Sequence, residues 1–151
     1  MPATVLANLP DHRLTLGEIL TWLVEDGLIN KPEADTLLKE SRLQRHNVHP
    51  LVIVADQKWK TVQEPHRPLT LEDLGEWMAE KVGLNYHHID PLKVDFSAVT
   101  EVMSSAYATR FGILPIQVTT REVVIATTQP FLRDWEREIK GKMVKKNQTT
   151  V

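Results

Sequence analysis

The stretch that decides the fold is residues 84–130, LNYHHIDPLKVDFSAVTEVMSSAYATRFGILPIQVTTREVVIATTQP. Two short apolar runs in it, residues 113–118 and 123–127, flank a polar turn, and β-branched residues on both sides of such a break are typical of a β-hairpin. Pro115 lacks the N–H that a strand ladder uses, so its strand is predicted to lie at a sheet edge. Amphipathic helical patterns precede and follow the hairpin. The stretch therefore predicts a small α+β module that makes contacts rather than performs chemistry.

The composition is that of a soluble globular protein with one ordinary domain or two small lobes: 151 residues, 42% hydrophobic and 25% charged. A formal net charge of -2 argues against a strongly basic nucleic-acid-binding protein. The absence of cysteine excludes a disulfide framework and a thiolate metal site, and it is consistent with a cytosolic location. No apolar run approaches the roughly 20 residues that cross a bilayer, and the N-terminus lacks a secretory signal pattern.

The first half of the chain is predicted to be helical. Residues 1–13 are expected to form a flexible arm. Thr15 and Glu18 then have the spacing of a capping box that starts a helix, and Gly27 can end that helix in a left-handed conformation. A second helix is expected to start after Asn30. The connection is short, so the two helices are expected to pack as an antiparallel pair.

Two further elements complete this half. The β-branched residues of the run 51–55 favour a short strand, with one turn of buried helix as the alternative. Thr70 caps a third helix that is expected to end at Gly83. The predicted organisation is therefore a helical lobe at residues 14–83, followed by a small α+β lobe at residues 84–151.

In the second lobe, Ser97 is expected to cap a single helix that ends at Gly112, just before the hairpin. After the hairpin, three apolar residues at helical spacing predict a last short helix. These residues are Phe131, Trp135 and Ile139. Residues 143–151 are expected to add a final strand. The fold class is α+β.

Motifs for common enzyme chemistry are absent from the sequence. There is no GxxxxGK[ST] phosphate-binding loop, no GxGxxG after a strand and no GxSxG elbow. His46 and His49 lie near Asp56, but a metal site needs three or four converging ligands, so the segment is interpreted as a polar loop. The four tryptophans are weighed as interface anchors against core residues: Trp22, Trp77 and Trp135 fit the core better, and Trp59 is left open between the two interpretations.

The segments GLNYHHIDPLKVD, SSAYATRFGILPIQV and VVIATTQP, in this order, resemble the N-terminal domain of type II secretion and type IV pilus assembly ATPases, the GspE/PilB-type traffic ATPases. The first half, with LTLGEILTWLVEDGLI, resembles the N-terminal lobe of the same family. The resemblance implies a non-catalytic module that precedes the motor, so no cofactor is expected here. ATP and magnesium are expected only in the downstream ATPase domain.

The resemblance also implies partners and a location. Domains of this kind dock onto the cytoplasmic domain of an inner-membrane platform protein, so a bacterial protein that is cytoplasmic and peripheral at the inner membrane through its partner is expected. No nucleic acid and no direct membrane span are expected. The predicted partner-binding residues are Trp22, Arg42, Arg45 and His46.

Some family members bind cyclic di-GMP through two copies of a motif resembling RLGxxLLxxGLI, which makes a cyclic di-GMP sensor the alternative function. Residues 23–29, LVEDGLI, match the second part of one copy, and the alternative site residues are Arg13, Gly27 and Leu28. The expected Arg-Leu-Gly is out of register, since Leu16 and Gly17 lie three residues too early and follow a threonine. Phosphate recognition needs donors such as arginine, so this departure weakens the alternative.

Overall fold

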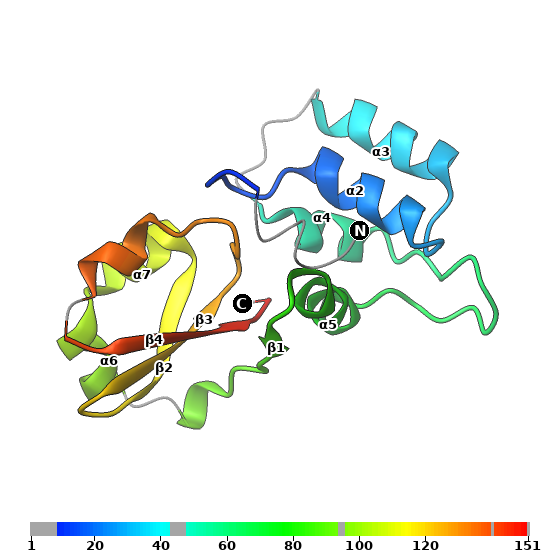
Figure 1. The fold of residues 1–151 in the computed structure, drawn as a ribbon. Coiled ribbons are helices and arrows are strands. Elements are labelled where there is room, and N and C mark those ends of the chain that lie inside the picture. Colours follow the sequence, from blue (N-terminus) through cyan, green and yellow to red (C-terminus); the bar gives the residue numbers. More distant parts are fainter. Residues whose placement is uncertain (1–8, 43–47, 94–95, 140, 151) are drawn as a thin grey trace. The chain divides into compact units, whose positions relative to one another are not determined.

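The computed structural model describes residues 9–42, 48–93, 96–139 and 141–150 (Figure 1). The chain divides into two compact units. The helical unit is Leu14–Leu74, and the α+β unit takes in Gly75–Val151 together with the preceding N-terminal arm. The sequence pattern predicted the boundary between the two lobes at residues 83 and 84.

Gly75 explains why the boundary falls inside a helix. Helix α5 (Leu71–Val82) begins in the helical unit and continues into the α+β unit. A Cβ atom at Gly75 would lie 2.3 Å from Cγ2 of Thr150 and 2.7 Å from Cε2 of Tyr86. The α5 backbone therefore closely approaches two segments of the α+β unit, and this contact is invisible in the local sequence pattern.

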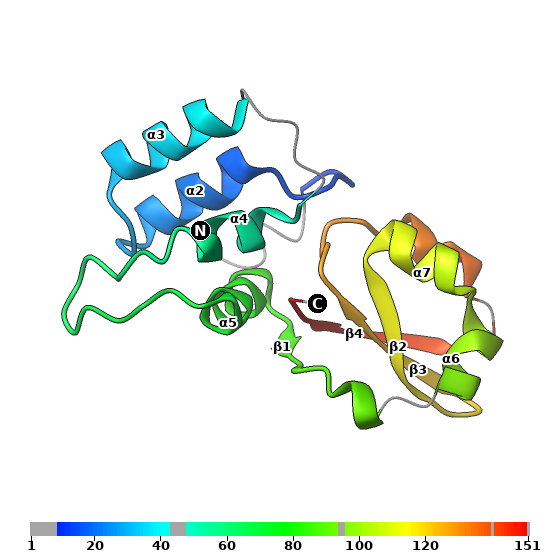
Figure 2. The same ribbon diagram turned by 180° about the vertical axis from the view of Figure 1, so that it is seen from behind.

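In the helical unit, α2 (Leu16–Glu25) starts as predicted. The backbone N–H of Glu18 donates to Oγ1 of Thr15 at 3.2 Å, and the N–H of Thr15 donates to Oε1 of Glu18 at 3.1 Å. Gly27 has φ 71°, the left-handed conformation expected after the helix. Helix α3 (Lys31–Arg42) follows and lies beside α2 (Figures 1 and 2).

The favoured strand at residues 51–55 is wrong, because this run lies in helix α4 (Pro50–Asp56). Two residues outside the apolar run decide its conformation. Pro50 occupies the first helical turn, where its fixed φ suits a helix and its missing N–H costs nothing. His49 caps the helix, since its Nδ1 accepts the N–H of Leu51 at 3.1 Å. Leu51 and Val54 are fully buried.

A long loop leads from α4 to α5 and folds back on itself. The N–H of Leu69 donates to the carbonyl of Trp59 at 2.8 Å, and Lys60 and Pro68 form an isolated antiparallel bridge. The N–H of Val62 donates to the carbonyl of Leu28 at 3.1 Å. These bonds fix the loop base and the position of Trp59 next to α4.

The α+β unit contains a four-stranded sheet in the order β1-β4-β3-β2. Strands β2 (Ile113–Val118) and β3 (Glu122–Thr127) form the predicted antiparallel hairpin. Strand β4 (Met143–Gln148) pairs in parallel with β3, which confirms the final strand, and β1 (Asn85–Tyr86) pairs in parallel with β4. Strand β2 is one of the two outer strands, so the edge position expected from Pro115 is confirmed.

Helices before and after the hairpin cover one face of this sheet (Figures 1 and 2). The covering elements are α6 (Phe96–Val102), α7 (Ser105–Phe111) and the 3₁₀ helix η2 (Asp134–Glu138). A 3₁₀ turn, η1 (Pro91–Lys93), precedes α6. Their core cluster contains Trp135, which is fully buried, and the sheet residues Ile113, Val123 and Ile125. The indole N–H of Trp135 donates to the carbonyl of Leu132 at 2.7 Å.

The single helix predicted between Ser97 and Gly112 is wrong, because the segment is split into α6 and α7. The reason is Ser104, whose side chain accepts the N–H of Tyr107 at 3.1 Å and so starts a new helix. Ser97 lies inside α6 rather than at its cap. Gly112 ends α7 with φ 63°, as predicted.

The described part of the N-terminal arm, residues 9–13, packs on the α+β unit. The ring of His12 stacks on Phe131 with centroids 5.1 Å apart, and Oδ1 of Asp11 accepts the N–H of Arg133 at 2.6 Å. These contacts hold the arm beside η2. The sequence alone did not indicate which segment the arm would contact.

Candidate functional site

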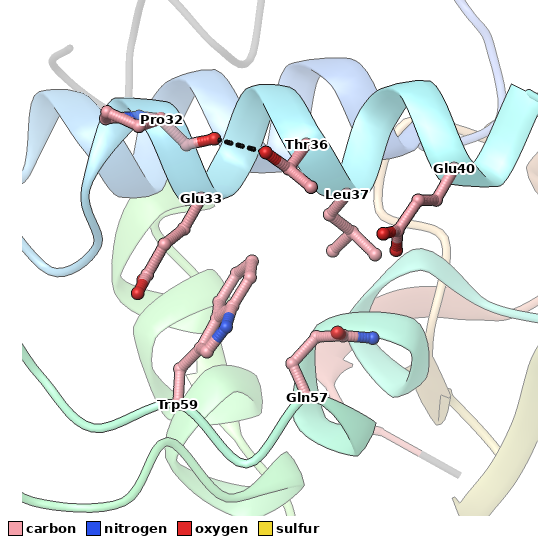
Figure 3. Close-up of a pocket in the computed structure, with 7 residues that line it drawn as sticks. All are labelled: Pro32, Glu33, Thr36, Leu37, Glu40, Gln57 and Trp59. Atoms are coloured by element: carbon pink, nitrogen blue, oxygen red, sulfur yellow. Dashed lines mark hydrogen bonds between the residues drawn. The ribbon is translucent and has the colours of Figure 1, made fainter.

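The surface of the helical unit has a groove between α3 and the end of α4, here called the Trp59 groove (Figure 3). It has a volume of about 300 Å³. Its lining residues are Pro32, Glu33, Thr36, Leu37, Glu40, Gln57 and Trp59. In Figure 3 Glu33, Leu37 and Glu40 extend from α3 toward the side of the groove formed by Gln57 and Trp59.

The polar groups of this groove are only partly used by the protein itself. The hydroxyl of Thr36 donates to the carbonyl of Pro32 at 2.9 Å, and Nε2 of Gln57 donates to the carbonyl of Ile53 at 3.2 Å. Within the described ranges, the carboxylates of Glu33 and Glu40 form no ion pair. The indole N–H of Trp59 likewise donates no hydrogen bond in that part of the chain. The groove therefore presents two acceptor groups and one donor beside an aromatic ring.

A second section extends the Trp59 groove along α3 and α4. It shares Leu37, Glu40 and Gln57 with the first and adds Ser41, Val48, Ile53 and Asp56. Val48 is 45% exposed, which is unusual for a large aliphatic residue next to a groove. The extension thus adds two apolar residues, one hydroxyl and one more carboxylate.

A separate groove runs between α2 and α3 and is more apolar. Its volume is about 310 Å³. It is lined by Gly17, Leu20, Thr21, Val24, Glu25, Lys31, Ala34, Asp35 and Leu38. A Cβ atom at Gly17 would meet nothing within 4 Å, so this end of the groove has room for a larger side chain.

The predicted partner-binding residues are not gathered at one place that the structure describes. Trp22 is buried, with 6% of its surface exposed, which agrees with its assignment to the core and leaves little of its indole open to a partner. Arg42 is the last residue of α3, and its side chain lies outside the described part. Arg45 and His46 also lie outside the described residues. Trp59, which the sequence left open, is instead half-buried at a groove.

The alternative nucleotide residues fall in different units. Gly27 and Leu28 form the turn after α2, and the amide nitrogen of Gln63 lies 2.7 Å from the position of a Cβ atom at Gly27. The Gln63 side chain therefore covers this turn. Arg13 belongs to the α+β unit, where its guanidinium donates to the carbonyl of Arg110.

Titratable groups do not form a recognisable reaction centre in the described ranges. No set of three His, Cys, Asp or Glu residues converges there in a geometry that could hold a metal ion. Tyr107 has a pKa raised above 10.0, chiefly because burial disfavours the phenolate and then because of the nearby Glu138. Its ring packs against Phe111 with centroids 4.8 Å apart, so Tyr107 acts as a packing residue.

No helix in the described ranges is both long and apolar enough to span a bilayer. A helical unit with open grooves and a sheet unit with a closed core together define a class of small α+β proteins made of two units. Comparison with known proteins identifies the family within this class.

Residues 82–149 match the MshEN domain family. The Type IV pilus assembly ATPase TfpB of Acinetobacter baylyi is 39% identical over 119 residues, which is 77% of this chain and 20% of TfpB. A solved structure of MshE with cdg has a TM-score of 0.57 and 17% identity, and the alignment covers 91% of both chains.

The chain belongs to the N-terminal domains of pilus and secretion ATPases, and residues 82–149 are its MshEN domain. This confirms the family resemblance. The matched region is outside the ATPase core. The chain spans 20% of the length of the curated relative that it matches. The chain is accordingly a non-catalytic region of such an ATPase.

Proposed function

We propose that this chain is a docking and regulatory domain that links a bacterial pilus or secretion motor to the cytoplasmic domain of an inner-membrane platform protein. The observation that carries the proposal is the 39% identity to a pilus assembly ATPase across most of this chain. A non-catalytic domain attached to such a motor has binding as its remaining task. The open grooves of the helical unit offer surface for that binding.

In this proposal the ATPase domain is the partner in the same protein, and ATP and magnesium act there. The platform protein holds the motor at the inner membrane, so this domain is cytoplasmic and peripheral through that contact. Arg42 ends α3, Arg45 and His46 follow it in sequence, and all three remain proposed contact residues. Whether the motor serves a pilus or a type II secretion system follows from which platform protein binds.

The second candidate function is a cyclic di-GMP sensor, and the observation that favours it is the shared fold with MshE, solved with cdg. Three features of this chain make it the weaker candidate. The Arg-Leu-Gly segment is out of register, and Gln63 covers the turn at Gly27. The guanidinium of Arg13 already donates to a backbone carbonyl.

Isothermal titration distinguishes the two functions. The purified chain is titrated in parallel with the cytoplasmic domain of the cognate platform protein and with cyclic di-GMP. Saturable binding of the platform domain alone supports docking. Binding of cyclic di-GMP alone, with weaker binding after Arg13→Ala, would replace docking with the sensor function.

A further inference from the structure

We infer that the Trp59 groove is a receptor for an arginine side chain on an extended segment of a partner protein. The inference deepens the docking function proposed above and rests on it for the identity of the partner. It depends on three properties of the groove: carboxylates that form no ion pair with any described residue, an accessible aromatic ring and a suitable size.

The described lining of the groove carries charge of one sign. Glu33 and Glu40 face it from α3, and Asp56 lines its extension. No lysine or arginine is among the described residues that line either section. Lys58 and Lys60 flank Trp59 in sequence but do not line the groove. Carboxylates that lack an ion pair are complementary to a cationic partner.

The aromatic wall favours arginine over lysine. Trp59 is half-buried, so its ring is held in place while part of it remains open to the groove. A guanidinium is planar and weakly hydrated, and it can stack on an indole while it donates to carboxylates at its edge. A lysine ammonium is a compact, strongly hydrated charge that gains less from the ring. The combination of Trp59 with Glu33 and Glu40 therefore fits a guanidinium best.

The size of the groove fits a side chain with a short length of backbone. A volume of about 300 Å³ is at the lower end of the roughly 300–1,000 Å³ found for small-molecule sites. Leu37 provides apolar contact for the methylene stem of the arginine. The exposed Val48 at the extension gives a neighbouring apolar residue of the same segment a place to pack.

The test is an NMR titration of the full 151-residue chain with three capped peptides. One alternates glycine with arginine, the second replaces arginine with lysine, and the third replaces it with citrulline, which keeps the shape without the charge. The arginine peptide is expected to shift the Trp59 indole signal and the α3 amides. The lysine peptide is expected to bind several-fold more weakly, and the citrulline peptide at least tenfold more weakly, since charge and ring contact are both reduced.

Two pairs of variants locate the site. Glu33→Gln with Glu40→Gln is expected to weaken arginine-peptide binding about tenfold. The matched control is Glu25→Gln with Asp35→Asn, which removes two charges from the groove between α2 and α3 and should leave binding unchanged. Trp59→Phe, which keeps a ring but lacks the indole N–H, should weaken binding less than Trp59→Ala. Circular dichroism of each variant verifies that it is folded.

Several outcomes would overturn the inference. These are equal binding of the citrulline peptide, shifts confined to other surfaces, or no shift at millimolar arginine peptide. Self-association with Trp59 shifts in the absence of peptide would make a second copy the occupant instead. If the platform domain binds equally to the Glu33 and Glu40 double variant, the groove inference fails while docking stands. If only the arginine peptide binds, the groove stands while docking to that platform fails.

Discussion

The two units of this chain use their apolar residues differently. The α+β unit closes a core around Trp135 between one sheet face and its covering helices, and strand β3 is buried along most of its length. The helical unit buries α2 and α4 but leaves two grooves along α3. Under the proposed function, the α+β unit is the stable scaffold and the helical unit is the binding surface.

Trp135 and Trp59 give the sharpest test of this contrast. Trp135→Ala is expected to lower the free energy of unfolding by about 3–5 kcal/mol, because a fully buried indole leaves a large cavity. Trp59→Ala is expected to lower the free energy of unfolding by about 1 kcal/mol, because removal of a half-buried ring costs fewer packing contacts. Urea denaturation followed by circular dichroism measures both. Equal losses would show that Trp59 is a core residue and would remove the contrast.

Two helical glycines form the next pair. Gly75→Ala is expected to destabilise the protein by about 1–3 kcal/mol, since the new methyl group would clash with Thr150 and Tyr86. Gly17→Ala meets no atom within 4 Å and is expected to stabilise by up to about 1 kcal/mol through helix propensity. Thermal unfolding of both variants checks the signs. A neutral Gly75→Ala would mean that α5 can move away from β1 and the chain end.

The smallest expected effect is at the start of α2. Thr15→Ala removes an N-cap and should cost about 1 kcal/mol of stability. Thr21, on the same helix, bonds the carbonyl of Gly17 at 2.8 Å, and this i−4 bond adds little. Thr21→Ala is therefore the matched control and should be near neutral. Chemical denaturation that ranks the two variants in the opposite order would contradict the capping account.

The sequence predicted features whose causes are local. The hairpin, the edge position of Pro115, the capping box at Thr15 and the left-handed glycines all depend on a few neighbouring residues. The prediction for residues 51–55 failed although its cause is also local. The β-branched composition was weighed without the start signal of His49 and Pro50. Ser104 was likewise overlooked as a cap within an apparently continuous helix.

The Trp59 groove could not be predicted from the sequence. It forms because α3 and the segment after α4 meet in space, about twenty residues apart in the chain, and no local pattern reports such a contact. The signal available in the sequence was Trp59 itself, an aromatic residue between two lysines in a polar stretch. The burial of Trp22 has the same explanation, because packing between elements decides which edge of a helix stripe is covered.

The central claim is that the helical unit docks a motor onto its platform protein. Hydrogen–deuterium exchange of the chain, with and without the cytoplasmic domain of the cognate platform protein, tests this claim most directly. The account predicts slower exchange in α3 and in residues 57–60, with the sheet of the α+β unit unchanged. Protection confined to residues 82–149, or protection by cyclic di-GMP but not by the platform domain, would contradict it.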